Sequence, residues 1–284
     1  MKRADKAILI TGASTGIGRA TALHLDSAGF RVFAGVRKEA DAEALTDEAS
    51  PCLSPVILDV TQEASVSAVA KEVTGQTGGS LFGLINNAGV SLNGPLELVP
   101  VPEIRKVFEV NVTGLLAVTQ AFIPHLREGS GRVVNISSGH GLLAIPDKSV
   151  YAASKFAVQA ISDSLRLELR PFGVLVSNLV VGKVDTAVLG KILDERERMA
   201  KEADPAVLEL YSPLFEFFDR EVKNLPGISP EEVAEVVGRA LMDRRPKAQY
   251  LVGPGARKMR NLAKIPRWLR DSLMYKALYR RGKR

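Results

Sequence analysis

The segment LITGASTGIGRA, residues Leu9–Ala20, places three glycines, Gly12, Gly16 and Gly18, between an apolar run and a helical pattern. The apolar run, residues 6–11, is short, rich in β-branched residues and bounded by glycine, so it predicts a buried strand. A phosphate needs close backbone approach and free N–H groups at a helix N-terminus, and glycine permits that approach because it has no Cβ. The segment therefore predicts a phosphate-binding strand–turn–helix unit, with a purely structural turn as the alternative.

The composition is that of an ordinary globular protein. The chain has 284 residues, of which 46% are hydrophobic and 25% are charged. No apolar run approaches the roughly 18 residues that a membrane span needs. The single cysteine, Cys52, cannot form an internal disulfide, so we expect a reducing, cytoplasmic location.

Short apolar runs alternate with helical patterns along most of the chain. Strands that read as continuous apolar runs between helices are typical of a parallel sheet covered on both faces. The sequence thus predicts an α/β fold with a doubly wound parallel sheet of about seven strands. The predicted strands are Lys6–Thr11, Arg31–Val36, Pro55–Asp59, Leu81–Asn86, Gly131–Ser137, Gly173–Val181 and Ala248–Gly253.

Two segments depart from this rhythm. Residues 187–228 are helical and rich in charge, and we expect them to form a substrate lid within a single domain, residues 1–254. Residues 255–284 form a basic helical extension with eleven Lys and Arg against one acid, Asp271, a net charge of +10. Because the whole chain carries +6, the rest carries about −4. The positive charge is therefore a property of the extension, and it gives little information about the fold.

Several motifs occur together in a fixed order. The glycine turn has the spacing G-x-x-x-G-x-G, NNAG follows at Asn86–Gly89, and Tyr151 precedes Lys155 by one helical turn in SVYAASKF. With these motifs, residues 5 to 253 resemble the short-chain dehydrogenase/reductase family, most closely its branch acting on steroids and retinoids. The resemblance implies a Rossmann fold and an oxidoreductase that interconverts a carbonyl and an alcohol with a nicotinamide cofactor.

The resemblance also implies a set of cofactor-binding residues. They are Gly12, Ser14, Thr15, Gly16, Ile17, Gly18, Arg37, Asp59, Val60, Asn87, Ala88, Gly89, Tyr151, Lys155, Val184 and Thr186. The second strand ends in Val36, Arg37 and Lys38, where an acid would repel a 2′-phosphate and a guanidinium can bind it. We therefore expect NADP(H) to be favoured over NAD(H), unless Arg37 is only a solvated loop charge. Asp59 would lie beside the adenine or cap a helix.

The expected catalytic set is Asn111, Ser138, Tyr151 and Lys155. Residues four apart share a helix face, and a nearby ammonium lowers the pKa of a phenol, so Lys155 is expected to make Tyr151 a better acid and base. The family resemblance implies that Ser138 stabilises the substrate oxygen and that Asn111 holds a water in a proton relay. Ser137 is expected to point away from the site because strand residues alternate.

Other features bear on substrate and partners. The family usually has Pro-Gly after the sixth strand, where this chain has Val181–Gly182. The three histidines lack ligand spacing, so we expect no metal site. His140 lines the substrate pocket or has no role. The aromatic lid predicts a hydrophobic small-molecule substrate.

Further expectations and alternatives concern the whole chain. The basic extension predicts either contact with an anionic membrane surface or a docked helix with a solvated face, and not nucleic-acid binding. The resemblance implies a homodimer or homotetramer. The alternative functions are reduction of 3-ketoacyl groups on a carrier protein and a non-catalytic NADP(H)-binding regulator.

Overall fold

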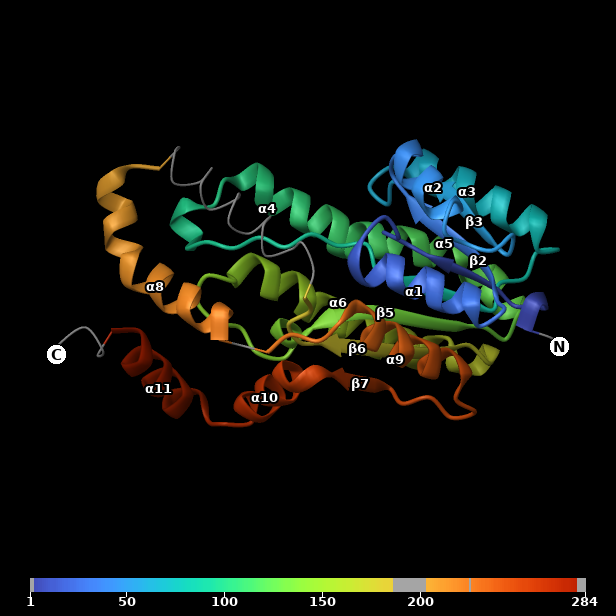
Figure 1. Cartoon of the computed structure of the whole chain (residues 1–284). Helices are drawn as coiled ribbons and strands as arrows, with labels where there is room; N and C mark the ends of the chain where they lie inside the picture. The colour runs from blue at the N-terminus through green and yellow to red at the C-terminus, as the bar shows by residue number, and fades with distance from the viewer. Residues whose placement is uncertain (1–2, 186–202, 225, 280–284) are drawn as a thin grey trace.

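The computed structural model describes residues 3–185, 203–224 and 226–279. Within them, a seven-stranded sheet has the order β3-β2-β1-β4-β5-β6-β7, and every adjacent pair is parallel (Figure 1). The strands are β1 (Ala7–Ile10), β2 (Arg31–Val36), β3 (Leu53–Ile57), β4 (Gly83–Asn86), β5 (Arg132–Ser138), β6 (Leu175–Val181) and β7 (Gln249–Val252). The predicted doubly wound α/β fold is confirmed.

Helices cover both faces of the sheet. The helices of the described residues are α1 (Gly16–Ser27), α2 (Glu39–Thr46), α3 (Glu63–Gln76), α4 (Val101–Phe108), α5 (Leu115–Glu128), α6 (Ser149–Glu168), α8 (Pro205–Asn224), α9 (Pro230–Met242), α10 (Gly253–Ala263) and α11 (Arg267–Tyr279). Of these, α8 and α11 pack on each other beyond the end of the sheet (Figure 1). Alternate β1 residues enter different cores: Ile8 packs with α1 and α9, whereas Leu9 packs with α3 and α5. The strand alternation thus produces two cores, one on each face.

The helical run from Val101 to Glu128 is interrupted. A π-helical segment, Glu109–Gly114, separates α4 from α5. A Cβ on Gly114 would lie 2.7 Å from the Val60 Cγ2, so this segment packs tightly against the loop after β3. By length and composition, Val101–Glu128 is the one described helical run that could cross a bilayer, but its α5 part packs on the sheet. Core packing of α5 accounts for the buried part of its apolar character.

The carboxyl ends of the parallel strands meet at one edge of the sheet. Thr11 follows β1, Asn87 follows β4, and Ser138 ends β5. Because neighbouring strands are parallel, these residues lie at the same edge, where open α/β sheets bind ligands. The fold therefore brings together motifs that are far apart in the sequence.

Candidate active site

The glycine turn lies against the NNAG loop. Gly12 has φ +67° and Gly16 has φ +55°. A Cβ on Gly12 would lie 2.8 Å from the Ala88 Cα, and one on Gly18 would overlap the Gly12 carbonyl oxygen. Neither position can hold a side chain without a backbone shift. The turn is therefore shaped by backbone contact with the loop after β4.

The first turn of α1 retains free backbone donors. Thr15 is its N-cap residue and is exposed, and its side chain makes no capping hydrogen bond. Ser14 beside it is partly buried, and Ile17 packs partly against the core. The first N–H groups of a helix have no partner within the helix, and the helix dipole makes that end positive. These residues fit the pyrophosphate of a dinucleotide.

Thr11 joins the two loops, a role that the sequence analysis missed. Its Oγ1 accepts hydrogen bonds from the N–H groups of Asn87, at 3.0 Å, and Ala88, at 2.9 Å. In return, Asn87 Nδ2 donates to the carbonyls of Thr11 and Gly12, at 3.0 and 2.9 Å. The only sequence signal for Thr11 is its position directly after β1. The pair locks the glycine turn onto the NNAG loop.

The expected adenine-side residues lie after β2 and β3. Arg37 is exposed at the end of β2, and the glycine turn reaches this strand through Ala13 N–H, which donates to the Gly35 carbonyl at 2.8 Å. Asp59 Oδ1 accepts hydrogen bonds from the N–H and the hydroxyl of Thr61, at 3.0 and 2.7 Å, and these bonds close a local turn. Val60 is buried. Arg37 is thus available to a ligand, whereas Asp59 also has a structural task.

Asn111 lies in the π-helical segment and holds the NNAG loop. Its Oδ1 accepts from Val90 N–H at 2.8 Å, and its Nδ2 donates to the Val90 carbonyl at 2.9 Å and to Ser154 Oγ at 3.0 Å. The side chain is 1% exposed. A π-turn inside a helix often marks a functional position. Here it lets one amide span the loop after β4 and helix α6.

Ser138, Tyr151 and Lys155 come together at the end of β5 and the start of α6. The side chain of Ser138 lies close enough to the Tyr151 phenol to act on its pKa as a hydrogen-bond donor, and Ser138 Oγ accepts from His140 N–H at 3.2 Å. Lys155 Nζ lies 5.9 Å from the centre of the Tyr151 ring and donates to the Ile136 carbonyl at 3.1 Å. A Cβ on Gly89 would lie 3.6 Å from that Nζ. The predicted catalytic residues are therefore neighbours of the cofactor loop.

Burial sets the protonation of this group. Burial raises the pKa of Tyr151, and the hydrogen bond from Ser138 acts in the opposite direction. Burial lowers the pKa of Lys155 to about 8. The expectation of a lowered Tyr151 pKa is therefore wrong for the protein alone, because desolvation of the phenol is the dominant effect. Tyr151 is a protonated phenol at neutral pH.

His140 packs edge-on against Tyr151, with ring centroids 5.9 Å apart. Burial and the nearby charge of Lys148 lower the pKa of His140 to about 4, so the ring is neutral at physiological pH. Ser137, by contrast, points away from Tyr151 and donates to the Lys155 carbonyl at 3.4 Å. The two neighbouring serines therefore have different partners, as strand alternation predicts.

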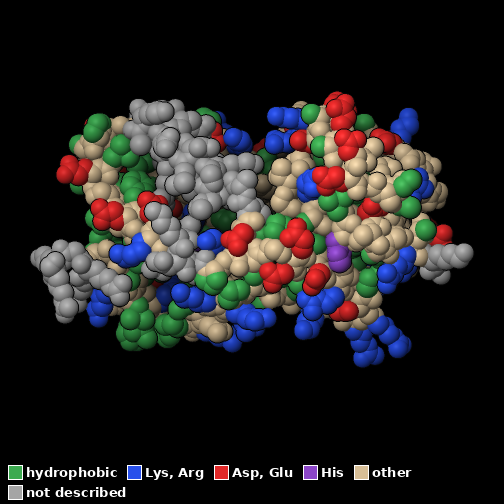
Figure 2. Space-filling view, in the orientation of Figure 1, with side chains coloured by type: hydrophobic (Ala, Val, Ile, Leu, Met, Phe, Trp, Pro, Cys, Tyr) green, Lys and Arg blue, Asp and Glu red, His purple; other side chains and the backbone are tan. Residues whose placement is uncertain are grey.

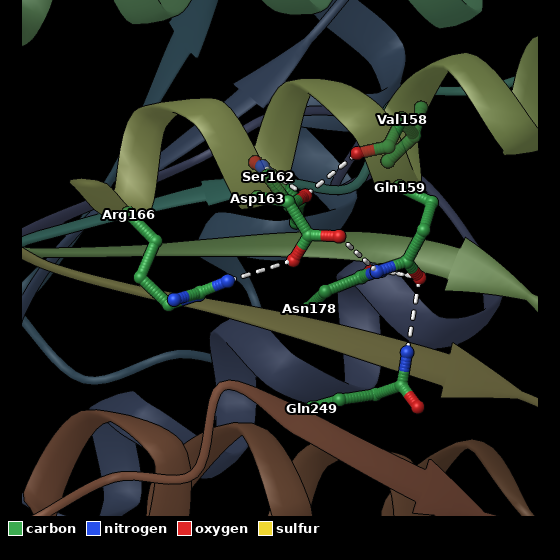
Figure 3. Close-up of polar contacts among 8 residues, drawn as sticks. Val158, Gln159, Ser162, Asp163, Arg166, Asn178 and Gln249 are labelled. Carbon is green, nitrogen blue, oxygen red and sulfur yellow. Dashed lines mark hydrogen bonds and ion pairs between the residues drawn. The ribbon is translucent and has the colours of Figure 1, made fainter. Parts of the chain in front are cut away.

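Helix α6 is tied to the sheet by amide side chains. Figure 3 shows Gln159 between Asn178 of β6 and Gln249 of β7. Gln159 Oε1 accepts from Asn178 Nδ2 at 2.6 Å and from Gln249 Nε2 at 3.0 Å. This bridge lies two turns after Tyr151 on the same helix. It fixes the helix that carries the candidate catalytic residues.

The loop after β6 is partly described. Val184 pairs with Ile228 in an isolated parallel bridge, and Asp185 N–H donates to the Ile228 carbonyl at 2.9 Å. Gly182, which follows Val181 where the family has proline, donates its N–H to the Val252 carbonyl at 2.9 Å. Thr186, a predicted cofactor-binding residue, lies outside the described residues.

Part of the predicted lid is the helix α8. Tyr211 donates its hydroxyl to Glu97 at 2.7 Å, which joins α8 to the segment after the NNAG loop. Phe218 is buried in a cluster with Leu214 and Leu278, against which Ile145 packs. Ile145 lies on the loop between Ser138 and Tyr151. Helix α8 thus contacts both loops that border the candidate catalytic residues.

Helix α10 packs against the loop that follows Ser138 (the serine loop), a contact that the sequence did not indicate. A Cβ on Gly139 would overlap the Met259 sulfur, and one on Gly182 would lie 3.1 Å from the Ala256 nitrogen. Ala256 is fully buried. The predicted domain boundary at residue 254 falls within the first turn of this helix.

Comparison with known proteins identifies the family. Residues 6–197 match the short chain dehydrogenase family. The chain is 35% identical to human short-chain dehydrogenase/reductase family 9C member 7, over 97% of this chain and 91% of the relative. It is also 35% identical to human retinol dehydrogenase 16, over 95% and 88%.

Solved structures agree with this match. A short-chain dehydrogenase from Streptomyces avermitilis has a TM-score of 0.79 at 30% identity, covering 98% of this chain and 99% of that one. One from Burkholderia cenocepacia in complex with NADP has 0.74 at 26%, covering 96% and 99%. One from Burkholderia phymatum in complex with NAD has 0.77 at 28%, covering 92% and 94%. The chain belongs to the short-chain dehydrogenase/reductase family, in its retinol dehydrogenase-like branch, and is an NAD(P)-dependent oxidoreductase.

Proposed function

We propose that this enzyme interconverts a carbonyl and an alcohol on a hydrophobic substrate, with NADP(H) as its cofactor. The observation that carries the proposal is the position of the Ser138 side chain close to the Tyr151 phenol, beside the buried ammonium of Lys155. Two hydroxyl donors at one point can hold and protonate a substrate oxygen. The nicotinamide cofactor supplies or accepts the hydride when it is bound.

The proton steps belong to the side chains. In reduction, Ser138 Oγ donates a hydrogen bond to the carbonyl oxygen, and Tyr151 transfers its phenolic proton to that oxygen. The raised pKa of Tyr151 in the protein alone keeps this proton in place at neutral pH. In oxidation, Tyr151 takes the proton of the alcohol and must first lose its own. We therefore propose that the rate of oxidation increases with pH as Tyr151 loses its proton.

Asn111 acts in this proposal as a positioning residue. Both of its Nδ2 hydrogens are used, on Val90 and Ser154, so only its Oδ1 lone pair can still accept a hydrogen bond. A relay water held by Asn111 would donate to that oxygen. The main task of the amide is to hold the loop that borders Lys155.

The preference for NADP(H) rests on Arg37. Its exposed guanidinium stands at the carboxyl end of β2, next to the glycine turn, where an acid would reject a 2′-phosphate. Arg37→Ala is expected to weaken NADPH binding at least tenfold and to change NADH binding less than twofold, as measured by titration of reduced-nicotinamide fluorescence. Lys71→Ala, an exposed lysine on α3, is the matched control. Equal losses for both cofactors would contradict this role.

The substrate class is tested by a screen. Retinoid and steroid aldehydes and ketones are compared with 3-ketoacyl thioesters, each with NADPH and NADH, and absorbance of the reduced nicotinamide is followed. Activity on the apolar carbonyls, lost by 10²-fold or more in Tyr151→Phe with cofactor binding kept, is the expected result. Preference for the thioesters would favour the carrier-protein reductase. Cofactor binding without turnover on any substrate would favour a regulator.

A further inference from the structure

Helix α11 carries an exposed aromatic and aliphatic face. Trp268 is 74% exposed, Tyr275 60% and Leu273 51%, and Leu269 and Tyr279 are also exposed. Trp268, Tyr275 and Tyr279 recur at spacings of seven and four, which places them on one side of the helix. Exposed large side chains in such a group are typical of an interaction surface.

The opposite face of α11 is already used. Leu278 is buried against Leu214 and Phe218 of α8, and Met274, one turn earlier, packs on the same cluster. The exposed face therefore does not serve the fold of this chain. At the same time, the packing holds α11 in place, so the exposed face is presented on a fixed support.

Positive charge surrounds this face. The segment from α10 to the end of α11, residues 253–279, has seven basic residues and a single acid, Asp271. The exposed ones are Arg257, Lys258, Arg260, Lys264, Arg267 and Lys276. Figure 2 shows Lys and Arg side chains with hydrophobic ones beside them along the lower left edge, over α10 and α11. Aromatic rings among cations match the boundary between headgroups and acyl chains of an anionic bilayer.

We propose that α10 and α11 dock the enzyme on the surface of an anionic phospholipid bilayer, with the Trp268 ring in the headgroup boundary. Nucleic acid is the poorer partner, because the face between the cations is apolar and a phosphate backbone offers nothing to bury it. The two helices of the docking surface also pack against the loop between Ser138 and Tyr151. Met259 of α10 lies against Gly139, and Leu278 of α11 shares a cluster with Phe218, against which Ile145 packs. Delivery of an apolar substrate from the bilayer to α8 would follow, and that consequence alone rests on the proposed function.

Trp268 is the single tryptophan of the chain, so its fluorescence reports on this face alone. The full chain is titrated with vesicles of phosphatidylcholine alone and with vesicles that contain 30% phosphatidylglycerol. The expected result is a blue shift and quenching by brominated acyl chains with the anionic vesicles only, reversed by 0.5 M NaCl. An unchanged emission with both vesicles would overturn the proposal, as would binding to duplex DNA at concentrations at which anionic vesicles are not bound.

Two charge-reversal variants separate a local surface from overall charge. Lys264→Glu with Lys276→Glu is expected to reduce the vesicle partition coefficient at least tenfold in co-sedimentation. Lys71→Glu with Arg105→Glu, exposed residues on α3 and α4, changes the net charge equally and is expected to stay within twofold of the unaltered protein. Circular dichroism confirms that both variants are folded. Equal losses in the two variants would mean that net charge, and not this face, binds the vesicles.

Discussion

The side-chain amide of Asn111 pairs with both backbone groups of Val90, accepting from its N–H at 2.8 Å and donating to its carbonyl at 2.9 Å. This reciprocal pair joins the π-helical segment between α4 and α5 to the loop after β4. The Asn111 amide thus gives Val90 the two backbone hydrogen bonds that a neighbouring strand would give it inside the sheet. The NNAG loop depends on it for its position beside Lys155.

Replacement of Asn111 should therefore damage stability and cofactor binding together. Asn111→Leu leaves the Val90 N–H and carbonyl without partners, which is expected to reduce the free energy of unfolding by about 2 to 4 kcal/mol. Urea denaturation measures this loss, and NADPH titration should show weaker binding. Ser154→Ala removes one bond of the same network and is expected to cost only about 1 kcal/mol. If the two variants lose the same stability, the Val90 pair contributes nothing.

The two serines at the end of β5 should differ in kinetics. Ser138 acts on the Tyr151 phenol as a hydrogen-bond donor, whereas Ser137 points toward the Lys155 carbonyl. Ser138→Ala is expected to reduce kcat about 10²-fold, because a donor to the developing charge is lost. Ser137→Ala should keep kcat within a few-fold. Steady-state assays on the best substrate of the screen decide between them, and a larger loss for Ser137→Ala would reverse the assignment.

Lys155 should give the fold a specific pH dependence. Its pKa is about 8 in the folded protein, against 10.5 for a solvated lysine, the value that applies to the unfolded chain. Between these values the unfolded chain binds more protons, so the stability contribution of Lys155 rises with pH. From pH 6.5 to pH 9.0, the free energy of unfolding of the unaltered protein should increase by about 1 kcal/mol more than that of Lys155→Met. Urea denaturation of both proteins at the two pH values cancels every other titrating group, and a constant difference would contradict the lowered pKa.

Two left-handed glycines provide a matched pair. Gly12 has φ +67°, and a Cβ at this position would lie 2.8 Å from the Ala88 Cα. Gly29 has φ +82°, and a Cβ there would have no atom within 4 Å. Gly29→Ala should cost only the backbone strain, about 1 kcal/mol. Gly12→Ala adds a backbone clash, so it should cost more and abolish dinucleotide binding. Thermal unfolding and NADPH titration compare them; normal binding by Gly12→Ala would show that the turn yields freely.

Sequence patterns located the strands and the clustered motifs because both depend on local periodicity and on the strand-end geometry of parallel sheets. All seven strands were predicted, with ends that differ by at most two residues. The π-turn at Asn111 escaped the pattern because it changes the helix by a single residue. Thr11 and Met259 escaped it because their contacts, with Asn87 and Gly139, join distant segments. The direction of the Tyr151 pKa was missed because burial is a property of the packed site.

The seating of Ala256 and Met259 against Gly182 and Gly139 has a practical meaning for fragments of this enzyme. A chain cut after residue 254 would keep every sequence motif, and its residues 6–197 would still match the family. It would nevertheless leave the turn after β6 and the serine loop without their backing. A complete set of motifs is therefore a poor guide to activity here, because helix α10 packs beneath the loops that carry the reacting groups.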